Sequence, residues 1–450
     1  MKNIFGFVFL FLFIEISAQN KSLVSGPMIG HTELRSSTIW IEAATSSGWS
    51  LKYFEPGSAK TSVNNHPIIQ PINDHYTLKF IAGNLEPGKT YQFQLLFKNV
   101  VAANGSFKTQ QLWQWRKPAP DFSFLTGSCA YFNQPEFDRP GKPYGGDSSI
   151  FETMAKEKAD FMLWLGDNWY TREADYFSEW GLNYRASRDR SLKVLQPFWK
   201  SMPQYAIWDD HDYSWNDGDK SYTLKDASRD VFMKVWCNPS YGENGEATYT
   251  KITWNDVDIF MLDDRWYRSN DSMKDSVDGK PNPSKKMFGE KQMEWLKNAL
   301  ISSQGNVNIN FRIIATGSQV LNPLSPFDCF RHFPAEYNEL LSFIRDNNIN
   351  GVVFLTGDRH HSEVIEAERP GTYPLYDITS SPLTSGVGRT FGPEKDNPAR
   401  VIPEIDEQNY ARITISGGKL DRKMTVEFMG IKGNKLGEWS VMQKEITAGK

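Results

Sequence analysis

Short apolar runs alternate with amphipathic stretches along most of the chain between residues 122 and 378. Runs of this length are typical of buried strands, and strands that alternate with helices fold as an α/β domain. The predicted strands are 122–125, 161–165, 205–208, 257–262, 311–315, 352–355 and 374–378, and the predicted helices are 148–158, 224–236, 290–302 and 334–345. After residue 409, alternating patterns predict further strands at 411–415, 424–428 and 439–442.

Residues 22–108 instead contain short alternating stretches separated by turns, a pattern that predicts an all-β sandwich. A Pro-Gly turn that leads to a strand tyrosine, Leu85-Glu86-Pro87-Gly88-Lys89-Thr90-Tyr91, resembles a fibronectin type III-like module. We therefore expect this module at residues 21–110 and the α/β domain at residues 118–450, joined by a segment rich in Trp and Pro.

The chain opens with Lys2, an apolar run at residues 4–14 and the small residue Ala18. This pattern predicts a signal peptide over residues 1–18, cleaved near Ala18, and therefore a secreted or periplasmic protein. The apolar run is too short to span a bilayer, and no later stretch predicts a transmembrane segment.

The three cysteines allow at most one disulfide.

Composition limits the classes of partner. The chain has 50 Lys and Arg against 54 Asp and Glu, a net charge of −4, so no basic surface for nucleic acid is evident. A hydrophobic content of 39 % and a charged content of 23 % are typical of a globular protein and exclude a disordered chain. With only seven histidines, a metal site must also use carboxylate, phenol or thiol ligands.

Reactive side chains follow four of the predicted strands. The four segments are Thr126-Gly127-Ser128-Cys129, Gly166-Asp167-Asn168-Trp169-Tyr170, Asp209-Asp210-His211-Asp212 and Thr356-Gly357-Asp358-Arg359-His360-His361. Ligands of α/β proteins bind at the carboxyl ends of strands, so we expect these segments to converge on one site. Clustered carboxylates repel one another unless a cation compensates their charge.

In this order the four segments resemble the alkaline phosphatase D (PhoD-like) phosphodiesterases of the calcineurin-like metallophosphoesterase superfamily. The resemblance covers most of the chain, because this family also carries a fibronectin-like module after a signal peptide. It implies a four-layer αββα sandwich for the α/β domain and a centre with two metal ions.

The resemblance also implies roles for individual residues. Asp167 would bridge both ions, with Cys129, Tyr170 and His360 on a ferric site. Asp210 and Asp358 would hold the second ion, which the resemblance implies is calcium. Thiolate and phenolate ligands suit Fe³⁺, and oxygen ligands suit Ca²⁺. Gln319 falls near the position of a histidine of the wider superfamily, and both a ligand role and a hydrogen-bonding role remain open for it.

The implied reaction is hydrolysis of phosphate monoesters, diesters or both, with a small-molecule ester or a phospholipid headgroup as substrate. Two cations neutralise the phosphate, and a metal-bound hydroxide attacks it. His211 is the candidate general acid, oriented by Asp212. Arg172 and Arg265 are candidates for binding the remaining phosphate oxygens, although arginines beside acidic residues more often form ion pairs.

Two other functions are also compatible with the sequence. An exported binding protein on a catalytically impaired hydrolase scaffold would explain the module and the signal peptide, but not the intact motif set. A glycosidase with paired carboxylates would explain the many aromatic residues, but it leaves Cys129 and the two Gly-Asp pairs without a role. Sensitivity to a chelator distinguishes a metal-dependent enzyme from a glycosidase.

Overall fold

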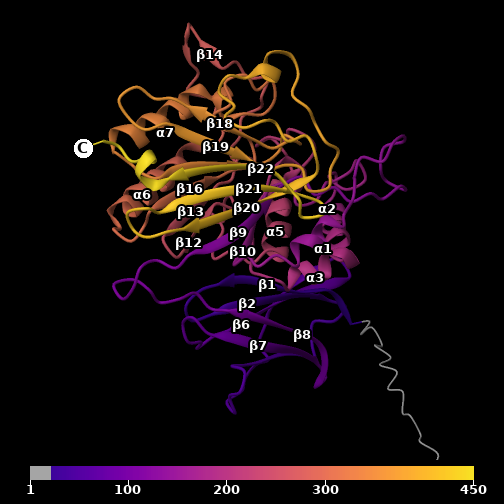
Figure 1. The fold of residues 1–450 in the computed structure, drawn as a ribbon. Helices are drawn as coiled ribbons and strands as arrows, with labels where there is room; N and C mark the ends of the chain where they lie inside the picture. Colours follow the sequence, from indigo (N-terminus) through magenta and orange to yellow (C-terminus); the bar gives the residue numbers. More distant parts are fainter. Residues whose placement is uncertain (1–21, 450) are drawn as a thin grey trace, which may run out of the picture.

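The computed structural model describes residues 22–449, which form a β-sandwich followed by a larger domain of sheets and helices (Figure 1). The sandwich consists of two antiparallel four-stranded sheets, with strand orders β1-β2-β6-β5 and β4-β3-β7-β8. Its strands are β1 (Leu23–Thr32), β2 (Ser37–Ala43), β3 (Trp49–Phe54), β4 (Ser62–Asn64), β5 (Ile68–Ile72), β6 (His75–Ala82), β7 (Thr90–Phe97) and β8 (Val100–Lys108). Alternate side chains such as Ile39, Ile41 and Phe93 fill the space between the sheets, which confirms the predicted all-β sandwich.

Two six-stranded sheets form the centre of the larger domain, with strand orders β11-β10-β9-β20-β21-β22 and β12-β13-β16-β17-β19-β18. The first sheet contains β9 (Phe122–Gly127), β10 (Phe161–Leu165), β11 (Gln204–Ile207), β20 (Asn409–Ser416), β21 (Lys423–Gly430) and β22 (Lys435–Met442). The second contains β12 (Thr250–Trp254), β13 (Val257–Met261), β16 (Phe311–Ala315), β17 (Val352–Thr356), β18 (Glu363–Ala367) and β19 (Leu375–Thr379). A small hairpin, β14 (Ser276–Val277) and β15 (Lys280–Pro281), projects at one end (Figure 1).

Helices cover the outer faces of both sheets (Figure 1). The first sheet carries the helices α1 (Ile150–Met154), α2 (Glu179–Arg190), α3 (Gln196–Trp199) and α5 (Lys225–Val235), and the second carries α6 (Gly289–Gly305) and α7 (Pro334–Asp346). Short helical turns complete the chain: α4 (Asp210–Tyr213), η1 (Lys193–Leu195), η2 (Phe330–His332), η3 (Gly392–Asp396) and η4 (Gln443–Ile446). The four-layer αββα sandwich is therefore confirmed.

The period-two pattern of β10 shows how the layers are built. Phe161, Leu163 and Leu165 pack into the core between the two sheets. Met162 and Trp164 point to the opposite face and pack with α1, α3 and α5. Because both faces of the strand are covered, its sequence is continuously apolar.

One predicted helix needs correction, and one observed helix has no counterpart among the predictions. Helix α1 is shorter than the predicted 148–158, because Lys156 and Glu157 bond three residues back and end the helix after Met154. Helix α2 was not predicted at all. Its buried face carries Asn183, Arg185, Asp189 and Arg190, so the sequence shows no apolar stripe there. Strands β12 and β18 were also missed.

A buried arginine joins the β-sandwich to the larger domain. The guanidinium of Arg190 lies 4.8 Å from the ring of Trp40 on β2, and 4.4 Å and 4.3 Å from the rings of Trp199 and Trp236. Trp40 also donates a hydrogen bond from Nε1 to the Lys234 carbonyl, at 2.9 Å. These contacts hold the sandwich against α2, α3 and α5.

The expected domain limits, 21–110 and 118–450, stay a prediction.

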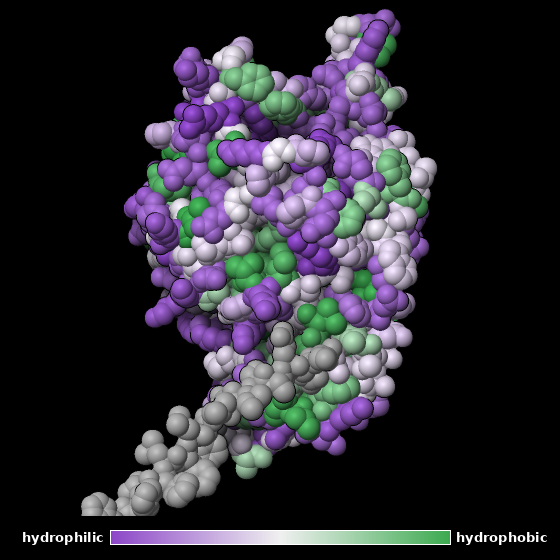
Figure 2. All heavy atoms as spheres, turned by 90° about the vertical axis from the view of Figure 1, so that its right-hand side faces the viewer, coloured by the Kyte–Doolittle hydropathy of each residue, from purple (hydrophilic) through white to green (hydrophobic). Residues whose placement is uncertain are grey.

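The predicted signal peptide, residues 1–18, lies outside the described residues. Among residues 22–449, no helix is both long and apolar enough to cross a membrane. The face turned toward the viewer in Figure 2 is largely hydrophilic, with apolar patches near its centre.

Candidate metal centre

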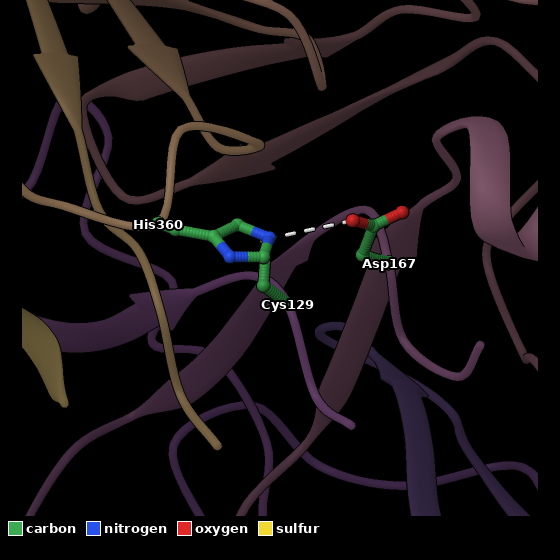
Figure 3. Close-up of side chains that lie close together, drawn as sticks. All are labelled: Cys129, Asp167 and His360. Atoms are coloured by element: carbon green, nitrogen blue, oxygen red, sulfur yellow. Dashed lines mark hydrogen bonds between the residues drawn. The ribbon is translucent and has the colours of Figure 1, made fainter. Parts of the chain in front are cut away.

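The ends of strands from both sheets meet at one place and bring the candidate ligands together. Strands β9, β10 and β11 run parallel in the first sheet, so their carboxyl ends share an edge, and the turn after β17 of the second sheet reaches the same edge. Three groups have ligand atoms within 4.8 Å of one another: Cys129, Asp167 and His360; Asp167, Asp210 and His211; and Asp209, Asp210 and Asp358. Asp167 and Asp210 each belong to two groups, so the groups form one continuous cluster. Figure 3 shows the first of them.

Unusual backbone conformations hold four of these side chains in the cluster. Cys129, Asp167, Asp358 and His360 have positive φ angles of 60°, 51°, 66° and 59°. Such angles are costly for residues other than glycine and concentrate at functional sites. Here each one turns the chain sharply where a strand ends, and this directs the side chain into the cluster.

The adjacent glycines permit close packing around these turns. A Cβ on Gly166 would lie 2.5 Å from the Asp209 Cβ. A Cβ on Gly357 would lie 2.7 Å from both the Leu165 carbonyl and the Ser128 side chain. Larger residues at these two positions would therefore push the strand ends apart.

Cys129 is fully buried beside a carboxylate. Its Sγ lies 3.5 Å from Asp167 Oδ2 and accepts a hydrogen bond from Ser381 Oγ at 3.2 Å. Burial and the nearby Asp358 carboxylate raise the pKa of the Cys129 thiol to about 11. The thiolate form therefore requires a positive charge close by.

Asp167 and Tyr170 form the adjacent part of the cluster. Burial, followed by repulsion from Asp210, raises the pKa of Asp167 well above its usual range. The Tyr170 hydroxyl lies 3.1 Å from His360 Nε2, and burial raises the pKa of this phenol as well. Ionising Asp167 and Tyr170 is therefore costly unless cations lie close by.

Asp210 and Asp358 form the third part of the cluster. Asp210 Oδ2 accepts a hydrogen bond from the Asp217 amide at 2.8 Å, whereas the buried Oδ1 has no partner among the described residues. Burial and then the Asp328 and Asp210 carboxylates raise the pKa of Asp358 to about 7.

His211 lies against Tyr170, with ring centroids 4.1 Å apart, and its Nε2 lies 3.8 Å from Asp210 Oδ2. The expectation that Asp212 orients this imidazole is wrong. The Asp212 carboxylate instead accepts hydrogen bonds at 3.0 Å from the amides of Asn168 and Asp209, and thereby caps the short helix α4. The carboxylate beside His211 is that of Asp210.

Both candidate arginines form contacts within the protein. Arg172 donates from Nη2 to Asp138 Oδ1 at 2.9 Å, and from Nη1 to the Tyr170 carbonyl. Arg265 is fully buried and donates from Nε to Asp209 Oδ1 at 2.6 Å and from Nη2 to Asp328 Oδ2 at 2.9 Å. In the structure both arginines therefore form ion pairs with carboxylates of the protein. Binding of phosphate oxygens by Arg172 and Arg265 stays a prediction.

Gln319 supports the turn that carries two candidate ligands. Its Nε2 donates to Glu363 Oε1 at 2.8 Å, and its Oε1 accepts a hydrogen bond from Arg359. Arg359 stands between Asp358 and His360 in the chain and also donates to Glu394 Oε2 at 2.8 Å. Both a metal-ligand role and a hydrogen-bonding role were left open for Gln319, and its side chain forms hydrogen bonds in the structure.

Comparison with known proteins identifies the family. A family model described as PhoD-like phosphatase matches residues 124–413, well over half of the chain. The chain belongs to the PhoD-like phosphatase family. It is 27 % identical over 385 residues to alkaline phosphatase D of Bacillus subtilis (strain 168), a match that covers 74 % of this chain and 64 % of the relative. The match thus spans less than two thirds of that relative.

Solved structures share the fold. A structure of PhoD aligns with a TM-score of 0.71 at 19 % identity, covering 94 % of this chain and 89 % of that one. A purple acid phosphatase from yellow lupin (Lupinus luteus) seeds aligns with a TM-score of 0.65 at 10 % identity, covering 92 % and 74 %. Both are similar in fold along nearly the whole chain, including the β-sandwich.

The donor set of this PhoD-like protein fits metal ions. Within residues 22–449, none of the carboxylates of Asp167, Asp210 and Asp358 forms an ion pair with a lysine or an arginine. Asp210 Oδ1 and His211 Nδ1 are buried without a hydrogen-bond partner in the same region. In their ionised form these buried carboxylates need cations close by, so the cluster is a candidate metal centre.

Two residues that contribute to this centre were not predicted from the sequence. The Tyr144 hydroxyl lies 3.0 Å from His360 Nδ1, and Ser381 donates to the Cys129 thiol. Tyr144 stands in a loop rich in Gly and Pro, and Ser381 lies far from Cys129 in the chain. Neither residue belongs to a strand-end motif, so no local pattern indicated either of them.

The titration of Asp358 predicts that metal stabilises the protein more at higher pH. Its pKa of about 7 in the folded, metal-free protein exceeds the unfolded value of about 4, so metal-free protein loses stability as the pH rises between these values. Protons compete with cations for the carboxylate. Adding metal to chelator-treated protein is therefore expected to raise the Tm by more at pH 8 than at pH 5, measured by scanning fluorimetry. An equal rise at both pH values would contradict this, and Asp358→Asn should reduce the difference.

Proposed function

We propose that this protein is an exported, metal-dependent phosphoesterase of the alkaline phosphatase D type that hydrolyses phosphate monoesters, diesters or both. The observation that carries the proposal is the convergence of thiol, phenol, carboxylate and imidazole groups in a buried cluster in which Asp167, Asp210 and Asp358 form no ion pair with a lysine or an arginine among the described residues. Family membership and the name of the Bacillus subtilis relative support it. Export rests on the predicted signal peptide. Small-molecule esters and phospholipid headgroups are the proposed substrates.

We assign the candidate ligands to two ions. Cys129, Tyr170 and His360 would hold a ferric ion, Asp210 and Asp358 would hold a calcium ion, and Asp167 would bind both. The donor chemistry supports this division, since thiolate and phenolate favour Fe³⁺ whereas carboxylate oxygens suit Ca²⁺. Two such ions, when bound, neutralise the oxygens of a phosphate ester and lower the pKa of a water molecule.

The chain's own groups then have distinct tasks. In hydrolysis a water oxygen forms a bond to phosphorus, while the bond from phosphorus to the alcohol oxygen breaks. The departing alcohol needs a proton, and His211 is the candidate donor, because its imidazole belongs to the cluster but is not a ligand in this assignment. Tyr170 and Asp210 hold its imidazole from two sides. Binding of the remaining phosphate oxygens by Arg172 and Arg265 stays a prediction, since both guanidinium groups contact the Tyr170 carbonyl or Asp209 in the structure.

A hydrolysis panel tests the function. Purified protein, analysed for bound metal, is incubated with nitrophenyl phosphate monoesters and diesters before and after treatment with a chelator. We expect turnover at neutral to alkaline pH that is lost with the metal and regained when metal is added back. If fully loaded protein hydrolyses neither class of ester, the proposal fails and the binding-protein interpretation is favoured.

Ligation of Fe³⁺ by Cys129 and Tyr170 predicts a coloured protein, because thiolate and phenolate transfer charge to ferric iron. Cys129→Ala is expected to shift or bleach the visible band and to reduce activity, and Tyr170→Phe should remove the phenolate contribution. Cys237→Ala is the matched control, since Cys237 is also buried but lies outside the cluster. A colourless, fully active protein whose Cys129 is readily alkylated with metal bound would exclude this assignment.

A further inference from the structure

Tyr144 reaches the metal centre from the solvent side. Tyr144 is 45 % exposed, whereas Cys129, Asp167, Tyr170 and Asp210 are all buried. The Tyr144 hydroxyl nevertheless lies 3.0 Å from His360 Nδ1 and 3.5 Å from His360 Nε2. The residue therefore stands where the cluster opens to solvent.

Several contacts hold Tyr144 in this exposed position. The amide of Gly145 donates to Asn133 Oδ1 at 2.9 Å, and the Asn133 amide group donates to the Gly145 carbonyl at 2.7 Å. The Gly146 amide donates to the Thr384 carbonyl at 2.6 Å, which ties the loop to the segment after β19. A Cβ on Gly386 would lie 3.3 Å from the Tyr144 ring, so that segment also packs closely against it. The phenol is thus preorganised and not a freely moving surface group.

The hydrogen bonds of His360 leave the Tyr144 proton available. His360 Nδ1 lies 2.7 Å from the Gly386 carbonyl, which can only accept, so Nδ1 carries the hydrogen. Nδ1 cannot then accept a hydrogen bond from Tyr144. His360 Nε2 faces Tyr170 at 3.1 Å and is the nitrogen left for an ion. Among the described residues, the one acceptor that the Tyr144 hydroxyl still reaches is His360 Nε2, at 3.5 Å, and the bound ion would occupy that nitrogen.

An anionic ester supplies the missing acceptor. We propose that Tyr144 is a substrate-binding residue whose hydroxyl donates a hydrogen bond to a phosphoryl oxygen of the ester held at the metal centre. The inference rests on the proposed function. Phosphate oxygens need donors, and both candidate arginines are engaged by carboxylates and carbonyl groups of the protein. A neutral phenol at the open side provides a donor without adding a charge to the centre.

Tyr144→Phe tests the proposal, because it removes the hydroxyl and keeps the ring that packs on Gly386. We expect this variant, loaded with metal, to bind inorganic phosphate about 10-fold more weakly in calorimetry and to lose about 10- to 100-fold in kcat/KM, as for a hydrogen bond to a charged group. Its metal content should equal that of the unaltered protein. Tyr176→Phe is the control, since the electrostatic neighbours of Tyr176 are Glu173 and Arg139 and not the candidate ligands. It should behave like the unaltered protein.

Other results would overturn the assignment in distinguishable ways. Unchanged phosphate affinity and kcat/KM in Tyr144→Phe, with an active unaltered protein, would refute the role of Tyr144 and leave the phosphoesterase function intact. A lowered metal content, with normal phosphate affinity restored by excess metal, would show that Tyr144 acts on the centre through His360 and does not contact substrate. If the loaded, unaltered protein neither hydrolyses esters nor binds phosphate, both the proposed function and this inference fail.

Discussion

Replacing Asp167 with asparagine is expected to deplete the protein of both metal ions. Asp167, like Asp210, belongs to two of the three groups of ligand atoms, and it links the group of Cys129 and His360 to the group that contains Asp210, so it is placed to bind both proposed ions. An amide offers one neutral oxygen in place of two that share a negative charge, and it cannot bridge cations in the same way. Since metal ions contribute several kcal/mol to such reactions, hydrolysis should fall by about three orders of magnitude or more. Elemental analysis after gel filtration and turnover of a nitrophenyl ester measure the two effects.

Asp160→Asn provides a matched control for this experiment. Asp160 precedes the first residue of β10, whereas Asp167 follows the end of the same strand. Its carboxylate accepts a hydrogen bond from the Ser123 amide at 3.1 Å, an interaction that asparagine can also make. This variant should retain both metal and activity. Retention of both ions by Asp167→Asn would contradict the bridging role.

His211→Ala is expected to lower turnover by about 10²- to 10⁴-fold, the usual contribution of a general acid or base, while the metal content stays near normal. The reason is that the assigned ligands do not include His211, although its imidazole lies within the cluster. If His211 protonates the leaving group, the loss should be larger for alkyl phosphates than for nitrophenyl phosphates, because nitrophenolate departs readily without a proton. Steady-state kinetics on both substrate types, together with metal analysis, provide the measurement.

The exposed His66 of the β-sandwich offers a control, since His66→Ala removes an imidazole far from the cluster in the chain and outside its ligand groups. Its turnover should match that of the unaltered protein. Loss of both ions in His211→Ala would mean that His211 is a ligand, and an equal loss on alkyl and nitrophenyl esters would argue against protonation of the leaving group.

Local patterns predicted most of the strands because a strand covered on both faces must be apolar throughout. The run 161–165 coincides with β10, and the run 311–315 coincides with β16. Helix α2 had no such signal, because its inner face pairs Arg185 with Asp175 and Asp189. A buried ion pair requires both partners to be in place, and only the folded chain brings them together.

Strand-end motifs indicated which chemical groups stand at the ends of the strands, and parallel strands in a sheet bring such groups to one edge. This is why Cys129, Asp167, Asp210, Asp358 and His360 could be assigned to one site. Which neighbour each group has depends on the packing of the folded chain. It turned Asp212 to the backbone, engaged Arg172 and Arg265 in ion pairs, and placed Tyr144 beside His360. Side-chain partners depend on distances between segments far apart in the chain, and these are set by the packing of the two sheets, which no local pattern records.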